Sequence, residues 1–244
     1  MNPIEEYYSR EDVQKFLLEF GKDREVVAVF RDQKFGKRPN ILQTKDDILE
    51  EVKKGAISFH CSAEKFVNPL ALEAGMPKEK IDELRIGWDL VIDIDIDSIE
   101  IAKIYAKVFC EFLKQYGIEN FMIKYTGNKS FHIIVFSESF PKKYGNIDVP
   151  KSYIEISKKI IEYLKFNTKD KIRELLIEFF SLKDLLNLTK KSLNEILDEE
   201  KRIDPFKIAK IDIFGLRHLF RMPYAINEKT YKVSIPINPK EIMN

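Results

Sequence analysis

The sequence predicts an α+β (mixed α/β) fold for this chain of 244 residues. Apolar runs with the pattern of β-strands occur both before and after a long stretch that has the composition of helices. In that stretch, residues 151–200, Lys and Glu interleave with Ile, Leu and Phe, and no glycine or proline occurs between Pro150 and Pro205. Strands on both sides of a helical insert, with further helices between the strands, are typical of mixed folds.

Periodicity and the positions of Gly and Pro define the individual elements. Residues 9–20 place Val13, Phe16, Leu17 and Phe20 on one face of a helix. We expect further helices at 45–53, 76–84 and 98–116, and strands at 25–31, 56–61, 90–96, 121–125, 131–136, 207–214 and 231–237.

These elements predict one domain that covers residues 1–244. It would comprise an N-terminal α/β module at 1–84, a sheet built from 85–150 and 201–244, and a helical insert at 151–200 with about three helices.

Composition narrows the class of protein. The 41 basic and 40 acidic residues give a net charge of +1, but nucleic acid remains a candidate partner because binding depends on where the charges lie. Cys61, Cys110 and three scattered histidines do not make a zinc site, so no zinc is expected. The N-terminus is polar and acidic, unlike a secretory signal, and no apolar run approaches the ~20 residues that span a bilayer. We therefore expect a cytoplasmic protein of prokaryotic type that does not contact a membrane.

Three acidic residues lie on the clearest strand, in the segment DLVIDIDID at 89–97. Alternate residues of a strand share a face, so Asp93, Asp95 and Asp97 point one way and the isoleucines between them point the other way. Aligned carboxylates repel one another, and a divalent cation such as Mg²⁺ or Mn²⁺ would compensate. The alternative is a solvated strand face. The spacing alone does not separate a polymerase from a nuclease or a glycosyltransferase.

A turn with many hydrogen-bond donors follows, in the segment KYTGNKSFH at 124–132. Gly127 and Asn128 tolerate positive φ, which predicts a hairpin. The exposed backbone N–H groups, together with Lys129 and Ser130, could hold phosphate oxygens. Ser130 and His132 are two residues apart and share a face of the returning strand. The alternatives are an ordinary hairpin and a half-buried histidine satisfied by a hydrogen bond.

The C-terminal segment at 210–237 is basic. Asp212 lies between two isoleucines on a predicted strand, and arginines in the following stretch could bind phosphates bidentately. The alternative is an exposed basic loop. The positive charges, which alternate with aromatic and apolar residues, come from Arg217, His218, Arg221, Lys229 and Lys232.

In this order the three segments resemble the archaeo-eukaryotic primase superfamily. That superfamily includes primase small subunits, primase-polymerases and the polymerase domains of bacterial end-joining ligases. The resemblance covers residues 85–236, and residues 1–84 fit more loosely. The first motif, D-x-D on a strand, matches Asp93 and Asp95; the second, S-x-H after a turn, matches Ser130 and His132; the third, an Asp on a strand with a downstream arginine, matches Asp212 and Arg221.

The resemblance implies a primase-polymerase catalytic core with an RRM-like sheet and an inserted helical subdomain. It implies two Mg²⁺ or Mn²⁺ ions, leaves Asp97 peripheral, and leaves Asp204 as a fallback for Asp212. Asp93, Asp95 and Asp212 would be the catalytic metal ligands. Ser130, His132 and Arg221 would bind the triphosphate, assisted by Lys129, Asn128, Gly127 and Arg217. Template phosphates would contact Lys37, Arg38 and Lys229.

The implied function is that of a template-dependent nucleotidyltransferase, a DNA-directed primase/polymerase. It would make or extend primers on single-stranded DNA from nucleoside triphosphates such as ATP, GTP or deoxynucleotides. Two departures from the family pattern favour a compact primase-polymerase: the cysteines of a zinc knuckle are missing, and the chain stops soon after the third motif. An accessory domain or subunit, beyond the C-terminus of this chain, would then be a separate partner, and association with CRISPR machinery is one possible setting. The rivals are a catalytically inactive, primase-like nucleic-acid-binding protein and a metal-dependent nuclease.

Overall fold

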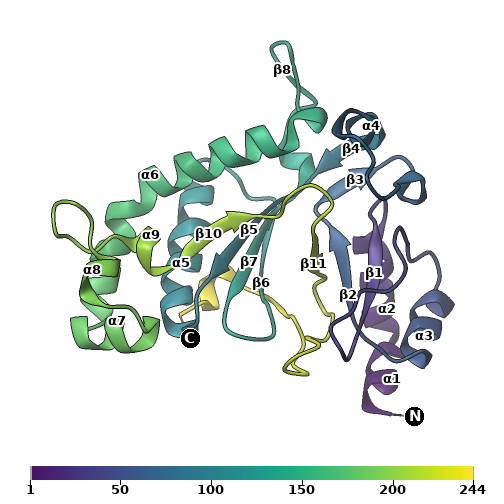
Figure 1. Cartoon of the computed structure of the whole chain (residues 1–244), viewed down its shortest axis with the longest axis horizontal. Coiled ribbons are helices and arrows are strands. Elements are labelled where there is room, and N and C mark those ends of the chain that lie inside the picture. The colour runs from purple at the N-terminus through teal and green to yellow at the C-terminus, as the bar shows by residue number, and fades with distance from the viewer. Residues whose placement is uncertain (1, 244) are drawn as a thin grey trace.

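The computed structural model describes residues 2–243, which fold around two antiparallel sheets (Figure 1). The smaller sheet has the strand order β1-β2-β11. Three N-terminal helices pack together beside this sheet, at the side of the molecule where the N-terminus lies. The strands are β1 (Val26–Phe30), β2 (Ala56–Ser62) and β11 (Leu219–Arg221), and the helices are α1 (Pro3–Tyr8), α2 (Glu11–Gly21) and α3 (Lys45–Lys53).

The larger sheet has the strand order β10-β5-β7-β6-β12, and every neighbouring pair is antiparallel. Because β5 and β6 both run antiparallel to the strand between them, they are parallel to each other, and the helix α5 connects them. The bounds are β5 (Leu90–Asp95), α5 (Ile99–Gln115), β6 (Phe121–Tyr125), β7 (Phe131–Val135), β10 (Lys210–Ile213) and β12 (Pro236–Ile237).

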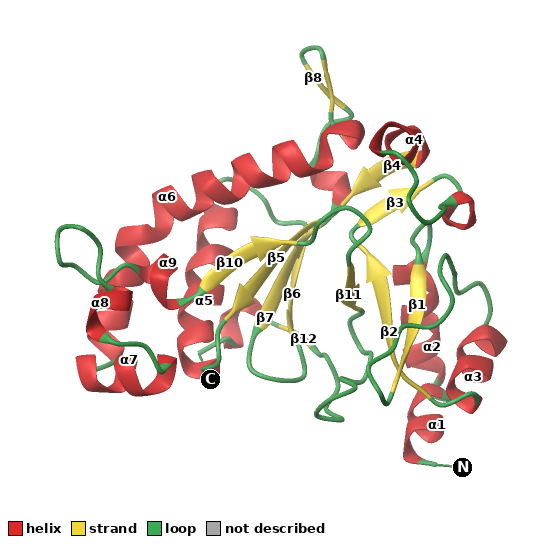
Figure 2. Cartoon of the chain, viewed as in Figure 1, coloured by secondary structure: helices red, strands yellow, loops and turns green. Residues whose placement is uncertain are grey.

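The remaining elements surround these two sheets (Figure 2). The long helix α6 packs against α5 and β10, and the short helices α7, α8 and α9 follow it. Two small ribbons pair β3 with β4 and β8 with β9. The bounds are β3 (Glu64–Phe66), α4 (Lys78–Leu84), β4 (Arg85–Trp88), β8 (Lys143–Tyr144), β9 (Ile147–Asp148), α6 (Tyr153–Phe179), α7 (Leu182–Thr189), α8 (Leu193–Ile196) and α9 (Pro205–Ile208). Short 3₁₀ helices lie at Pro69–Ala71, Ser137–Ser139, Pro150–Ser152 and Pro239–Glu241.

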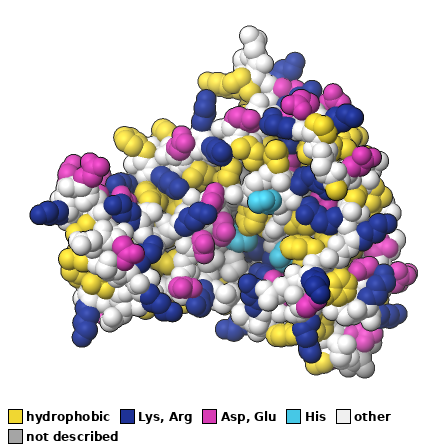
Figure 3. Space-filling view, in the orientation of Figure 1, with side chains coloured by type: hydrophobic (Ala, Val, Ile, Leu, Met, Phe, Trp, Pro, Cys, Tyr) yellow, Lys and Arg dark blue, Asp and Glu magenta, His cyan; other side chains and the backbone are white. Residues whose placement is uncertain are grey.

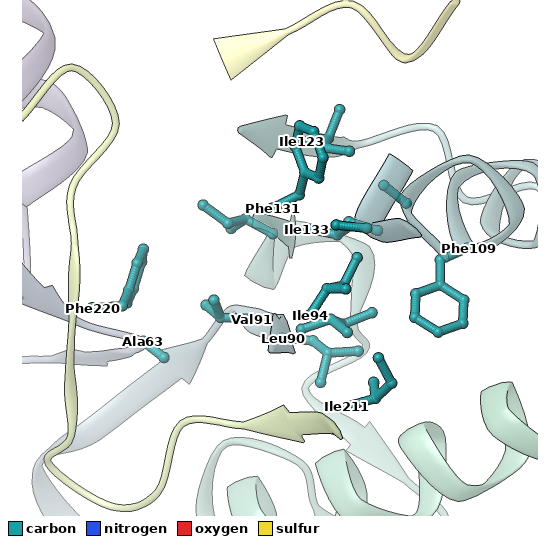
Figure 4. Close-up of a cluster of buried hydrophobic side chains, with 14 of the residues drawn as sticks. Ala63, Leu90, Val91, Ile94, Phe109, Ile123, Phe131, Ile133, Ile211 and Phe220 are labelled. Atoms are coloured by element: carbon teal, nitrogen blue, oxygen red, sulfur yellow. The ribbon is translucent and has the colours of Figure 1, made fainter. Parts of the chain in front are cut away.

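One hydrophobic cluster extends through both sheets. Figure 4 shows Ile94, Ile133 and Ile211 of the larger sheet near Phe109 of α5, so the isoleucine face of β5 is the one that α5 covers. At the start of β5, Val91 points the other way, toward Phe220 of the smaller sheet. The polar face of the larger sheet is therefore buried at one end, where the two sheets meet.

The structure confirms the predicted hairpin of strands 121–125 and 131–136, and the predicted helices at 45–53 and 98–116. The strand predicted at 207–214 is shorter, because Asp204 caps the helix α9 and Pro205 begins it, so β10 starts only at Lys210. The strand predicted at 231–237 is reduced to two residues. α1, β3, β4 and β11 were not expected, since segments of three to six residues carry little periodicity.

Residues 201–244 contribute strands to both sheets. β10 and β12 lie at the two edges of the larger sheet, whereas β11 pairs with β2 of the smaller sheet. The division into a module at 1–84 and a sheet from 85–150 and 201–244 stays a prediction. Within residues 2–243, no helix combines the length and the apolar character needed to cross a bilayer.

The packing of α5 predicts a large loss of stability when its buried face is truncated. Phe109 is fully buried, so Phe109→Ala should lower the free energy of unfolding by about 3–5 kcal/mol. Phe166 on α6 is 83% exposed, and Phe166→Ala should change it by less than about 0.5 kcal/mol. Urea unfolding of both variants measures the difference. Equal losses would contradict this account of the core.

Candidate functional site

A row of polar side chains crosses four strands of the larger sheet. In the register of the strands, Asp212 on β10 is opposite Asp93 on β5, Asp93 is opposite His132 on β7, and His132 is opposite Lys124 on β6. Residues directly opposite each other in antiparallel strands share a face. The row therefore lies on the face of the sheet that α5 does not cover.

The carboxylates occupy the β10 end of this row. Asp93 is partly buried, and Asp95 is exposed at the end of β5, on the same face and opposite Lys210. Partial burial, followed by the neighbouring charge of Asp93, raises the pKa of Asp95. For Asp212 partial burial opposes ionisation, but the Lys210 ammonium, with its Nζ 2.9 Å from Oδ2, brings the pKa below its ordinary value.

These carboxylates have the ligand chemistry for Mg²⁺ or Mn²⁺. Asp93, Asp95 and Asp212 share one face of adjacent strands, as the sequence predicted for the first two. Among residues 2–243 no three His, Cys, Asp or Glu side chains are already gathered as a metal-binding group. Since Asp212 is paired with Lys210, it would have to turn from the lysine toward Asp93 to complete such a group. Asp204 caps α9 and pairs with Lys169, so its carboxylate is already engaged there.

The turn at 126–130 adjoins the row, because it connects β6 to β7. Gly127 has a φ of +82°, and a Cβ atom there would lie 2.9 Å from both the Lys232 carbonyl oxygen and the Asn227 Cβ. The N–H and the hydroxyl of Thr126 both donate to the Ser130 carbonyl, at 3.0 and 3.1 Å. Position 127 therefore needs glycine for its positive φ, as predicted, and also because a side chain there would have no space. Asn128 and Lys129 are exposed at the tip, where Lys129 lies 3.1 Å from Asp97.

His132 is buried in the middle of the row. Its Nε2 lies 3.4 Å from Oδ1 of Asp93, and its ring packs at 5.4 and 6.1 Å from those of Phe214 and Phe220. Burial, and then the nearby Lys124 ammonium, lowers the pKa of His132 to about 4. The imidazole is therefore neutral at pH 7, and its Nδ1 has no hydrogen-bond partner among the described residues.

Lys124 ends the row and is a site residue that the sequence reasoning missed. It is fully buried, donates to Ser234 Oγ at 2.9 Å, and lies 6.0 Å from the centroid of the Phe220 ring. Burial, and then the charge of Arg221, lowers the pKa of Lys124 to about 7. The signal was available: a turn at 126–130 pairs Tyr125 with Phe131, so the next pair on the other face is Lys124 with His132.

Arg221 lies behind the turn in a buried ion pair. Its Nη2 donates to both carboxylate oxygens of Glu228, at 2.7 and 2.8 Å, its Nε donates at 3.1 Å, and its Nη1 donates to the Thr126 carbonyl at 3.0 Å. His60 is opposite Arg221 on β2, with Nε2 3.5 Å from Glu228. Burial opposes ionisation of Glu228, but His60 and Arg221 hold its pKa well below the usual range. No sequence pattern pointed to Glu228 or His60.

Arg217 and Arg38, which were also predicted to bind phosphates, have partners away from the 126–130 turn. Arg217 donates its backbone N–H to Glu64 at 2.7 Å, and its Nη2 lies 3.6 Å from Glu25. Arg38 binds the buried Glu25 carboxylate bidentately at 2.8 and 2.9 Å. Both arginines are thus engaged with buried carboxylates rather than with the 126–130 turn. Lys37 and Lys229 are exposed.

The space-filling view shows how these groups meet the surface. Histidine side chains gather at the centre of the face in Figure 3, in a hollow between the two halves of the molecule and beside a group of acidic side chains. Lys and Arg side chains lie around them. The fold and site together define a class: an α+β protein with a carboxylate cluster next to a turn rich in hydrogen-bond donors.

Comparisons with known proteins give that class a family. Residues 92–239 match the DNA primase small subunit family, which is well over half of the chain, and the chain belongs to this family. It is 29% identical over 201 residues to an uncharacterized protein of Methanocaldococcus jannaschii, an alignment that covers 76% of this chain and 42% of that protein. The chain thus spans less than half the length of this curated relative.

A solved structure has the same fold. The polymerase domain of Mycobacterium tuberculosis ligase D in complex with DNA is similar with a TM-score of 0.53 and 15% sequence identity, over 98% of this chain and 81% of that one. The resemblance to the archaeo-eukaryotic primase superfamily and the predicted α+β class are therefore confirmed.

The buried lysine predicts an unusual dependence of stability on pH. In the unfolded chain Lys124 regains a pKa of about 10.4, so between about pH 7 and pH 10 the unfolded state binds more protons than the folded state. Burial of this group therefore costs most stability below pH 7, and the cost disappears as the pH rises. Lys124→Met should be more stable than the wild type by a few kcal/mol at about pH 6, and this advantage should shrink toward about pH 10.

Urea unfolding of both proteins across this pH range measures the effect. Lys114→Met, at an exposed position of α5, is the matched control and should differ from the wild type by the same small amount at every pH. A Lys124→Met advantage that stays constant with pH would contradict the lowered pKa.

Proposed function

We propose that this chain is a template-dependent nucleotidyltransferase, a DNA primase/polymerase that makes or extends primers from nucleoside triphosphates. The observation that carries the proposal is the register that sets Asp212 beside Asp93 and Asp93 beside His132, next to the 126–130 turn. Membership of the primase small subunit family and the fold of a polymerase domain support it.

In this proposal Asp93, Asp95 and Asp212 hold Mg²⁺ or Mn²⁺. Divalent cations held there would lower the charge on the triphosphate and activate the attacking hydroxyl group. The chain's own contribution is to align these carboxylates on two rigid strands and to keep Lys210 as their counter-charge while no cation is bound.

The triphosphate would lie along the 126–130 turn. Ser130, Lys129 and the backbone N–H groups of residues 127–130 offer donors, and the neutral His132 offers one more without adding repulsion to a nearby cation. The protonated form of the buried Lys124 raises the positive potential behind the turn, whereas Glu228 neutralises Arg221; neither cationic side chain is free to contact a phosphate in this structure.

A single-stranded DNA template would contact exposed cations such as Lys37 and Lys229. Contacts to phosphates carry no sequence information, as a polymerase that accepts any template requires. Arg38 would contribute only through its charge, since Glu25 holds its guanidinium. Support for DNA as the partner comes from the ligase D polymerase domain, which was solved in complex with DNA.

One assay separates this proposal from its rivals. The protein is incubated with single-stranded DNA, Mg²⁺ or Mn²⁺ and labelled nucleotides, with and without a primer. Primer extension or new labelled product supports the proposal. A shortened template would indicate a nuclease, and an unchanged template without product would indicate a non-catalytic binding protein; either outcome would overturn the proposal.

Loss of one carboxylate should abolish incorporation. Asp93→Asn and Asp95→Asn keep the shape of the side chain but remove the charge that a divalent cation needs, so incorporation should fall by at least about 10³-fold. Asp170→Asn, on the exposed surface of α6, is the control and should retain wild-type activity. Circular dichroism verifies that each variant folds. Retained activity in either strand variant would exclude the proposed metal ligands.

His132→Ala should weaken nucleotide binding more than template binding. The imidazole lies beside Asp93, on the strand that leaves the turn where the triphosphate is proposed, whereas the template cation Lys37 is exposed in the loop that follows β1. Titrations with a nucleotide and with a fluorescent single-stranded oligonucleotide measure the two affinities. We expect a loss of about tenfold for the nucleotide and less than about twofold for the oligonucleotide. Equal losses would argue against a triphosphate role.

A further inference from the structure

Arg221 and the chain that follows it form hydrogen bonds to one side of the 126–130 turn. The Thr126 carbonyl accepts from Arg221 Nη1 at 3.0 Å and from Asn227 Nδ2 at 3.2 Å, and the Gly127 carbonyl accepts from Thr230 Oγ1 at 2.5 Å. The Asn227 Cβ also closes the space beside Gly127. Two successive carbonyls of the turn are thus fixed from residues about a hundred positions later in the sequence.

Glu228 holds Arg221, one of the three side chains that donate to the turn, in place. Its carboxylate receives three hydrogen bonds from Arg221, and the exposed fractions of the two side chains are only 7% and 11%. An arginine held bidentately by a carboxylate has its guanidinium plane fixed. The direction of Nη1, and with it the position of the Thr126 carbonyl, therefore depends on Glu228.

A carboxylate at this place opposes the proposed substrate. It would repel a nearby triphosphate, and it neutralises an arginine that could otherwise bind a phosphate. A buried charge pair of this kind contributes little net stability compared with well-packed apolar residues. Its value therefore lies in the geometry that it imposes on the turn.

We infer that Glu228 is a positioning residue of the nucleotide site: through Arg221 it fixes the Thr126 carbonyl, and thereby orients the backbone N–H groups of residues 127–130 toward the triphosphate. The inference rests on the proposed function for the identity of the ligand. The fixed turn itself is a property of the free protein. Arg221 acts here as a brace behind the turn, and no direct contact between Arg221 and the phosphates is needed.

Two variants test the brace. Glu228→Gln keeps the shape but removes the charge, and Arg221→Lys keeps the charge but loses the fork that joins Glu228 to Thr126. Both should speed exchange of the Thr126 amide hydrogen, which donates to the Ser130 carbonyl across the turn, in the free protein. Both should also weaken binding of dATP with Mn²⁺ by about tenfold, measured by calorimetry without template. If turnover is measured, the loss should appear in the KM for the nucleotide more than in kcat.

The control is Asp89→Asn, which disrupts the buried ion pair of Asp89 with Arg24 at the other end of β5. It should lower stability to a similar degree but leave exchange in the turn and dATP affinity unchanged. If Glu228→Gln does not fold, Arg221→Lys provides the same two readouts.

The direct-ligand alternative predicts the opposite sign. If Arg221 binds the phosphates itself and Glu228 merely competes with them, Glu228→Gln frees a cation and removes a negative charge. Tighter dATP binding with unchanged exchange in the turn would therefore overturn the inference. If the wild type binds no nucleotide, the proposed function fails, and exchange of the Thr126 amide hydrogen still decides whether the brace exists: faster exchange in the variants supports it, and unchanged exchange overturns it.

Discussion

The antiparallel register of β10, β5, β7 and β6 is the constraint on which the rest of the site depends. It sets Asp212, Asp93, His132 and Lys124 side by side on one face, and a shift of one residue in any strand would send that strand's member of the row to the other face. The register is itself held by the isoleucines that alternate with these polar residues and pack under α5. The same alternation therefore builds the core and aligns the polar row, so the site cannot lose its order without exposing apolar surface.

The charges in this row change sign from one end to the other. Two carboxylates lie at the β10 side, a neutral imidazole lies in the middle, and a buried lysine lies at the β6 side. A nucleoside triphosphate with its divalent cations has the complementary arrangement of charge, with cations at one end and phosphates at the other. The neutral state of His132 fits this gradient, because a charged imidazole beside Asp93 would compete with a cation for that carboxylate. The electrostatic pattern thus supports the proposed function independently of the family relationship.

The sequence predicted which side chains form this site better than it predicted the residues with which they pair. Strand alternation is local, so it correctly placed Asp93 and Asp95 on one face, and the glycine at 127 correctly indicated a tight turn. The pairing of Arg38 and Arg217 with Glu25 depends on which separate segments meet, and no spacing within one segment encodes that. Arg221 and Glu228 are only seven residues apart, but their pairing depends on the path of the loop that follows β11, which strand alternation does not predict. Lys124 falls between these cases, because the length of the turn and the pairing rule of a hairpin would have placed it opposite His132. The short strand β11 was missed for a related reason: its three residues become a strand only through their pairing with β2.

The segment from β11 to β12 both connects the two sheets and contacts the turn of the candidate site. It leaves the smaller sheet at Arg221, contacts the turn through Asn227 and Thr230, and enters the larger sheet at Pro236. The Tyr125 N–H donates to the Ile235 carbonyl at 2.8 Å, and the Ile235 N–H donates back to the Tyr125 carbonyl at 3.1 Å. The hydrogen bonds that hold the turn therefore continue directly into the pairing of β12 with β6. The turn is therefore held in its shape only when both sheets are formed and packed together. Buried polar and ionic groups at such a joint have a directional requirement that apolar side chains lack. This requirement accounts for the costly burial of Arg221, Glu228 and Lys124, with the His60 imidazole beside Glu228, where the relative position of the two sheets matters most.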